Sequence, residues 1–228
     1  DVFSSSELAL KLRVPSSNIQ NYLETLANNE LIDRIEKGKY CRIYVRDKFI
    51  IGSGIIDGGV VSHQSALAYH GLDKDVPGLV YISSRQQKNS KTIYGNRINF
   101  IRIRPHKDFG SVRVNNQNGA FMVTDTEKTI IDCFDLPKYV TSYKRLISRL
   151  KDIPLNQVKL LEYGLRMNNL SVLKRMAYLF EANNPIQYEY FRLEVKSRLN
   201  IKYTLLDPSG PDSGPFISKW RIRNNIDS

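Results

Sequence analysis

The sequence has few residues that could hold a metal or form a disulfide. Its 228 residues include two cysteines and three histidines. Cys41 and Cys133 lie far apart and in different expected elements, so neither a disulfide framework nor a cysteine metal cluster is indicated. His63 and His70 are separated by seven positions, whereas a zinc-binding helix places its histidines four apart. We interpret both as hydrogen-bonded structural residues, and we expect no metal and no cofactor.

Long hydrophobic runs are also absent. No stretch of about 18 apolar residues occurs, which excludes a predicted transmembrane helix, and the first residues are polar rather than typical of a signal peptide. We therefore expect a cytoplasmic protein that does not contact a membrane. The hydrophobic content of 41% and charged content of 25% are typical of a folded globular chain, and the length allows two domains.

Familiar catalytic motifs are missing as well. The chain contains no Gly-x-Ser-x-Gly and no His-Glu-x-x-His. Glu194-Val195-Lys196 matches the short tail of a metal-dependent nuclease motif, for which Asp132 or Asp135 could supply a second Mg²⁺ ligand. Such nucleases carry this tail on a strand, whereas here it falls in an expected helix. We expect that the protein is not an enzyme, and a nuclease remains the alternative.

Positive charge is abundant. The chain has 34 Lys and Arg against 23 Asp and Glu, a net charge of +11, which favours a polyanionic partner. Residues 83–107 contain seven basic side chains and no acidic one. Six of them define a candidate basic surface on the larger domain: Arg85, Lys88, Lys91, Arg97, Arg102 and Arg104. The alternative is a solvated sheet edge that is protected from aggregation by its charge.

The first 46 residues predict two helices and a hairpin. Ser4 and Glu7 form a capping-box pattern that opens a helix over residues 5–12. Arg13-Val14-Pro15 ends it, and a second helix follows to about residue 27. Helical spacing predicts that one stripe of this second helix is core, namely Ile19, Tyr22, Leu23 and Leu26. Residues 31–44 predict a hairpin with its turn at residues 37–39.

This order is typical of a winged helix-turn-helix that binds double-stranded DNA. The short amides and hydroxyls on the polar stripe of the second helix suit base edges, and basic residues of the hairpin suit phosphates. The candidate DNA-binding residues are Ser16, Ser17, Asn18, Gln20, Asn21, Lys37, Lys39 and Arg42. Because residues 1–46 carry a net charge of only +1, a module for protein contact remains the alternative.

The remainder predicts a mixed sheet followed by helices. Strands are expected at residues 80–83, 92–94, 98–104 and 120–123, with a hairpin turn at Gly95-Asn96. A second capping box, Thr124 to Glu127, opens a helix, and further helices are expected over 138–150, 155–167, 170–181 and 186–199. We therefore predict an α+β fold with a winged helix-turn-helix domain at residues 1–46 and a sheet-plus-helices domain at 47–228.

Several segments together resemble the AbiEi antitoxins of type IV toxin-antitoxin systems. They are the winged helix-turn-helix, residues 61–72 (VSHQSALAYHGL), residues 123–132 (VTDTEKTIID), Leu206-Asp207-Pro208 and Lys219-Trp220. The resemblance implies a regulator that binds repeats in its own promoter, and a C-terminal domain that counteracts an AbiEii-type nucleotidyltransferase toxin or acts on that toxin's nucleic-acid target. A stand-alone defence-related regulator without a toxin is the alternative.

Overall fold

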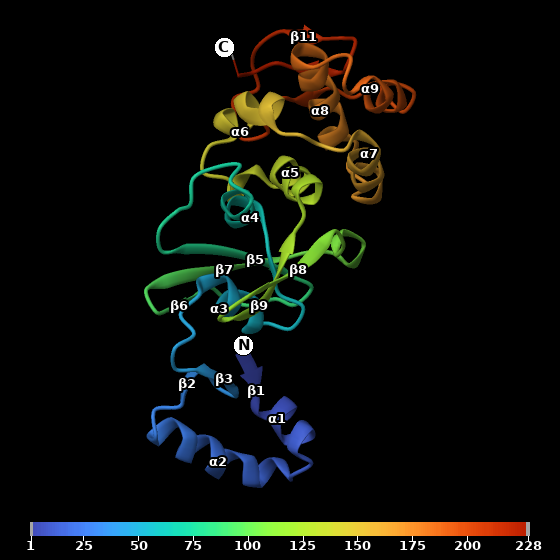
Figure 1. Ribbon diagram of the computed structural model, residues 1–228. Coiled ribbons are helices and arrows are strands. Elements are labelled where there is room, and N and C mark those ends of the chain that lie inside the picture. The colour runs from blue at the N-terminus through green and yellow to red at the C-terminus, as the bar shows by residue number, and fades with distance from the viewer. Residues whose placement is uncertain (1, 227–228) are drawn as a thin grey trace. The chain divides into compact units, whose positions relative to one another are not determined.

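The computed structural model describes residues 2–226, which form two compact units. The first unit comprises residues 1–65 and 76–124, and the second comprises residues 66–75 and 125–228. The sequence-based boundary at residue 46 falls inside the first unit. This unit therefore contains both the expected N-terminal domain and the larger sheet (Figure 1).

The N-terminal segment folds in the order strand, helix, helix, hairpin. The elements are β1 (Val2–Ser4), α1 (Ser5–Leu12), α2 (Ser16–Asn28), β2 (Ile32–Glu36) and β3 (Lys39–Arg42). The sheet order is β1-β3-β2, and both pairings are antiparallel. The capping box is formed, because Ser4 Oγ accepts from the backbone N–H of Glu7 and the Glu7 carboxylate accepts from that of Ser4.

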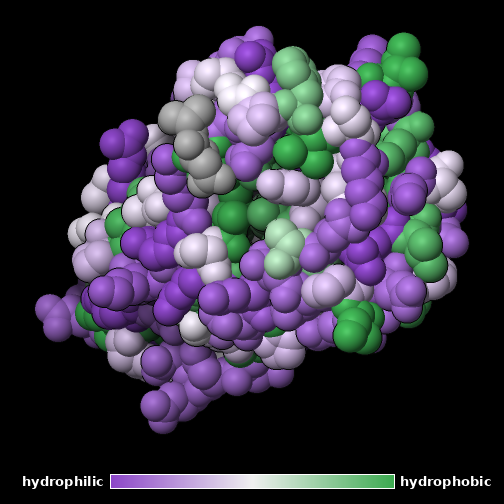
Figure 2. Space-filling view, turned by 90° about the horizontal axis from the view of Figure 1, so that it is seen from above, coloured by the Kyte–Doolittle hydropathy of each residue, from purple (hydrophilic) through white to green (hydrophobic). Residues whose placement is uncertain are grey.

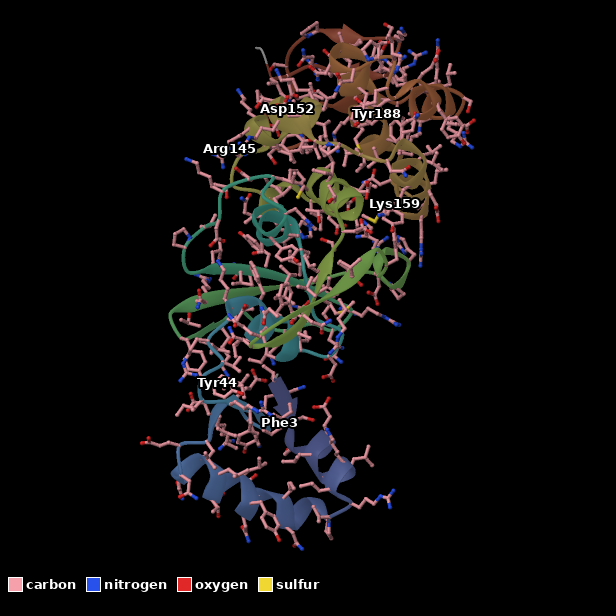
Figure 3. All side chains as sticks on the ribbon, viewed as in Figure 1. Phe3, Tyr44, Arg145, Asp152, Lys159 and Tyr188 are labelled. Atoms are coloured by element: carbon pink, nitrogen blue, oxygen red, sulfur yellow. The ribbon has the colours of Figure 1, made fainter. Side chains whose placement is uncertain are left out.

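A small hydrophobic core joins the two helices to this sheet. Its buried members are Ala9, Ile19, Leu23, Ile32 and Tyr40, and Phe3 of β1 stacks on Tyr40 with ring centroids 6.1 Å apart (Figure 3). The prediction that Tyr22 is part of the core was wrong, since Tyr22 is 60% exposed. It lies at the margin of the buried stripe, so its ring remains in solvent while Leu23, one position further, is fully buried.

The rest of the first unit is built on a mixed six-stranded sheet with the order β6-β7-β5-β4-β9-β8. After α3 (Lys48–Gly54), the strands are β4 (Val60–Val61), β5 (Leu79–Ser84), β6 (Lys91–Ile93), β7 (Asn96–Arg102), β8 (Ser111–Asn116) and β9 (Gly119–Thr124). Strands β5 and β7 are parallel, and β4 is antiparallel to β5. The carboxyl ends of β5 and β7 and the start of β4 therefore meet at one end of the sheet.

The β6–β7 hairpin turns one residue earlier than expected. Ile93 pairs with Asn96, so the turn residues are Tyr94 and Gly95, with φ of 47° and 76°. A two-residue hairpin that matches the twist of its strands requires positive φ at both positions. Glycine adopts this conformation readily, and the Tyr94 hydroxyl donates to Asp33 at 2.7 Å.

The second unit is mainly helical. Helix α4 (His63–Tyr69) spans the division, and α5 (Thr126–Asp135), α6 (Tyr143–Arg149), α7 (Gln157–Arg166), α8 (Leu170–Asn183) and α9 (Glu189–Lys196) follow. A small sheet, ordered β10-β12-β11, is formed by β10 (Thr204–Leu205), β11 (Phe216–Ile217) and β12 (Ile222–Arg223). The surface seen in Figure 2 is largely hydrophilic, with hydrophobic residues in small separate groups.

Together these elements define the α+β class, with mixed sheets and helices. Among residues 2–226, no helix combines the length and the hydrophobicity needed to cross a membrane.

Candidate nucleic-acid interface

Helix α2 presents an exposed polar face. Its buried side is anchored by Ile19 and Leu23. On the opposite side Asn18, Gln20 and Asn21 are exposed, as the sequence predicted, and Thr25 Oγ1 donates to the carbonyl of Asn21. Gln20 Nε2 donates to Glu24 Oε1 at 2.9 Å, so one candidate amide already has a partner on the same face.

The start of α2 has no side-chain cap. Pro15 occupies the N-cap position and makes no side-chain capping hydrogen bond, while the backbone N–H of Asn18 in the first turn donates to the Pro15 carbonyl at 3.0 Å. Ser16 and Ser17 lie in that first turn. Their side chains are outside the part of the chain that the structure describes. Arg13, just before this turn, is exposed and has a left-handed backbone with φ of 55°.

The β2–β3 hairpin is short at its tip. Glu36 pairs with Lys39, so the turn consists of Lys37 and Gly38 alone. Lys37 is exposed, and Arg42 is exposed with its Nη1 donating to the Tyr44 hydroxyl at 2.7 Å. Lys39, the third basic candidate of the hairpin, already has a partner, because its Nζ lies 3.0 Å from Asp57 and only 18% of its side chain is exposed. A phosphate contact by Lys39 would have to replace this ion pair.

Two residues of the expected basic surface are engaged with the hairpin. Lys88 and Lys91 lie 2.5 Å and 3.3 Å from the two carboxylate oxygens of Glu36. Burial alone would raise the pKa of Glu36, but the hydrogen bonds and charges of these two lysines lower it overall. Lys88 and Lys91 therefore hold the hairpin tip within the first unit, and part of their charge is neutralised there.

Replacing Glu36 by glutamine tests this attachment. Because the folded-state pKa of Glu36 is lowered, its carboxylate stabilises the protein above its unfolded pKa, and that stabilisation is lost as pH falls through the folded-state pKa. We expect Glu36→Gln to reduce the free energy of unfolding by about 1 kcal/mol near pH 7 and by much less near pH 3. Urea denaturation at both pH values measures this. Glu162→Gln, an exposed site on α7, should have no effect, and an equal loss at both pH values would contradict the assignment.

The other four basic-surface residues are not gathered in one place. Arg97 is exposed near the start of β7. Arg85, Arg102 and Arg104 line a cavity of about 840 Å³ at the opposite end of that strand. The cavity wall also contains Asp57 and Asp108, which the sequence did not single out. No sequence motif marks these two aspartates, because they come close to the arginines only where the ends of the strands meet in the fold.

The three acidic residues of the nuclease alternative each interact with a residue outside that set. Glu194 lies in helix α9, and its carboxylate is 2.5 Å from Arg198 Nη1. Asp132 forms a buried ion pair with Lys128, and Asp135 accepts from Asn169 Nδ2 at 2.7 Å. Within residues 2–226, no group of three or more His, Cys, Asp or Glu side chains is placed to hold a metal ion.

The fold, rather than the sequence, connects this chain to known proteins. Comparison with protein-family models gives no match, and a search of curated proteins gives none. At the level of the α+β fold, the chain is similar to a solved mycobacterial protein. This is the crystal structure of the RV2827C protein from Mycobacterium tuberculosis, with a TM-score of 0.62 and 12% sequence identity over 97% of this chain and 85% of that chain. The similarity concerns the fold alone.

Proposed function

We propose that residues 1–46 form a winged helix-turn-helix that binds double-stranded DNA, and that the chain is a transcriptional regulator. The observation that carries this proposal is the order β1-α1-α2-β2-β3 with the sheet order β1-β3-β2. Two consecutive helices joined by a short turn are packed on a small sheet through a core of their own. In helix-turn-helix proteins, the second helix enters the major groove.

Helix α2 supplies the sequence reading in this proposal. Its exposed Asn18, Gln20 and Asn21 are side chains that can bond to base edges, and the positive end of the helix dipole at its start suits a phosphate. The hairpin contributes less than a long wing would, because its turn has two residues and Lys39 pairs with Asp57. Lys37 and Arg42 remain as phosphate contacts.

We further propose that this regulator acts on its own promoter as the antitoxin of a type IV system, counteracting a nucleotidyltransferase-like toxin. The resemblance of residues 61–72 and 123–132 to the AbiEi antitoxins supports this. In the fold these two segments start on neighbouring strands, since Val61 of β4 pairs with Val123 of β9 in parallel. Each strand leads directly into a helix, α4 or α5.

Cells that carry a reporter under the chain's own promoter, together with a gene for an AbiEii-type nucleotidyltransferase, test both parts. Expression of the chain should repress the reporter and relieve the growth arrest caused by the nucleotidyltransferase. Asn21→Ala should lose repression because it removes a base contact. If the unaltered chain left the reporter unrepressed, the proposal that it is a transcriptional regulator would be contradicted. Repression without growth rescue would instead favour the stand-alone regulator over the antitoxin.

A further inference from the structure

Three arginines converge at the end of the six-stranded sheet where β5 and β7 terminate. Ser84 is the last residue of β5 and pairs with Arg102, the last residue of β7. Arg85 follows directly on one strand. Arg104 lies two positions beyond Arg102 on the other, in an extended conformation that puts alternate side chains on the same side. All three line the cavity of about 840 Å³.

The loop before β4 forms the facing wall of this cavity. It contributes Asp57 and Gly58 to the cavity lining, and it is fixed to β5 because Ser84 Oγ donates to the carbonyl of Asp57 at 3.0 Å. The hydrogen bond from Lys39 to Asp57 is the main cause of the lowered pKa of Asp57, whose carboxyl therefore stays ionised. The cavity is thus built from ordered backbone and has a defined charge pattern.

The three guanidinium groups have no protein partner. Within residues 2–226, the side chains of Arg85, Arg102 and Arg104 form no hydrogen bond or ion pair, although two carboxylates lie in the same cavity wall. One of these carboxylates, Asp57, is already paired with Lys39. Positive charge is therefore in excess, and the planar donors of arginine are suited to the oxygens of a phosphate group.

We propose that this cavity binds a small molecule that carries a terminal phosphate group, such as a nucleoside monophosphate. Its volume lies within the range of about 300–1,000 Å³ that is common for small-molecule sites. Its position, outside the carboxyl ends of parallel strands, is one at which sheets often hold ligands. Asp108 is exposed in the wall and accepts hydrogen bonds from a hydroxyl or amino group of the ligand.

A small phosphate ester fits this cavity better than the backbone of duplex DNA. The carboxylates of Asp57 and Asp108 line the same cavity as the arginines, so a continuous row of phosphates would meet repulsion there. A single phosphate can be oriented toward the guanidinium groups alone. The proposal does not depend on DNA binding by α2, and either can fail without the other.

Isothermal titration calorimetry of the full chain, at constant ionic strength with chloride as the background anion, tests the proposal. The probes are inorganic phosphate, a nucleoside monophosphate and the same nucleoside without phosphate. We expect one saturable site for the monophosphate, weaker saturable binding of inorganic phosphate, and none of the nucleoside. Arg102→Gln and Arg104→Gln should each weaken binding by about tenfold, the change that corresponds to one lost charge-assisted contact.

Arg97→Gln is the matched control, because Arg97 is an exposed arginine on the same strand outside the cavity. It should bind as the unaltered chain does. Asp108→Asn should weaken binding of the monophosphate and leave binding of inorganic phosphate unchanged. Since the cavity arginines have no partners in the fold, unchanged thermal unfolding of the variants is expected. Amide NMR shifts of residues 84–86 and 102–104 on phosphate addition give a readout that needs no variant.

Three results would overturn the proposal. The first is absence of saturable binding by both phosphate probes, and the second is equal weakening by Arg97→Gln. The third is a loss of duplex-DNA binding in the cavity variants without any binding of the small probes, which would make the cavity a DNA contact instead.

Discussion

Phe180→Ala is expected to lower the free energy of unfolding of the second unit by about 3–5 kcal/mol. Phe180 is 1% exposed, and its ring stacks on Tyr188 with centroids 3.9 Å apart. Phe191 meets the same ring edge-on at 5.4 Å. Removing the ring leaves a cavity between α8 and α9 and deletes both aromatic contacts, which add to the lost burial.

The chain provides its own probe for this experiment. Trp220 is the single tryptophan, is 1% exposed, and donates from Nε1 to Glu181, the neighbour of Phe180, at 2.6 Å. Urea denaturation followed by Trp220 fluorescence should show an earlier midpoint for Phe180→Ala. Leu193→Ala on α9 is the control, because Leu193 is 61% exposed. A loss below about 1 kcal/mol in Phe180→Ala would contradict the described packing.

Removing the polar face of α2 should abolish most sequence-specific DNA binding. Each well-made side-chain contact to a base is worth about 1–3 kcal/mol, so Gln20→Ala and Asn21→Ala together should weaken binding to the chain's own promoter by about 30-fold or more. Binding to a shuffled duplex should change little. Both side chains are exposed, so the fold of α2 should be preserved.

Fluorescence anisotropy with the two labelled duplexes measures this change. Asn89→Ala provides the control, since Asn89 is an exposed amide in the segment between β5 and β6, away from α2 in the sequence. It should bind both duplexes as the unaltered chain does. If the double variant kept its preference for the promoter duplex, α2 would not be the reading helix.

Helix starts that depend on neighbouring residues were predicted to within one residue. The box of Ser4 and Glu7 correctly placed the start of α1, because its hydrogen bonds join residues three apart. The second capping box was misplaced by one residue. Thr124 is the last residue of β9, and Asp125 is the cap that accepts from the N–H of Lys128.

Features that depend on distant pairing were missed. Strands β1 and β4 have three and two residues, too few for a periodic pattern, and they exist only through their partners in the sheets. The ion pairs of Glu36 with Lys88 and Lys91 join residues more than 50 positions apart. Sequence patterning identified those lysines as basic but not as already paired.

The same distinction between local features and features that depend on distant pairing applies to the candidate sites. The exposed amides of α2 follow from helical periodicity, which is a local property. The cavity of Arg85, Arg102 and Arg104 follows from the register of β5 against β7. No pattern within the segment 83–107 separates these three arginines from Arg97, which lies on the same strand but outside the cavity.

A salt titration of the unaltered chain tests most directly the claim that it is a sequence-specific DNA-binding protein. Affinity for the promoter duplex and for a shuffled duplex of equal length would be measured from low to physiological salt. Phosphate contacts weaken with salt on both duplexes, while base contacts are retained only on the promoter. We predict that promoter binding persists at a salt concentration where binding to the shuffled duplex has faded. Two curves that fall together would contradict it.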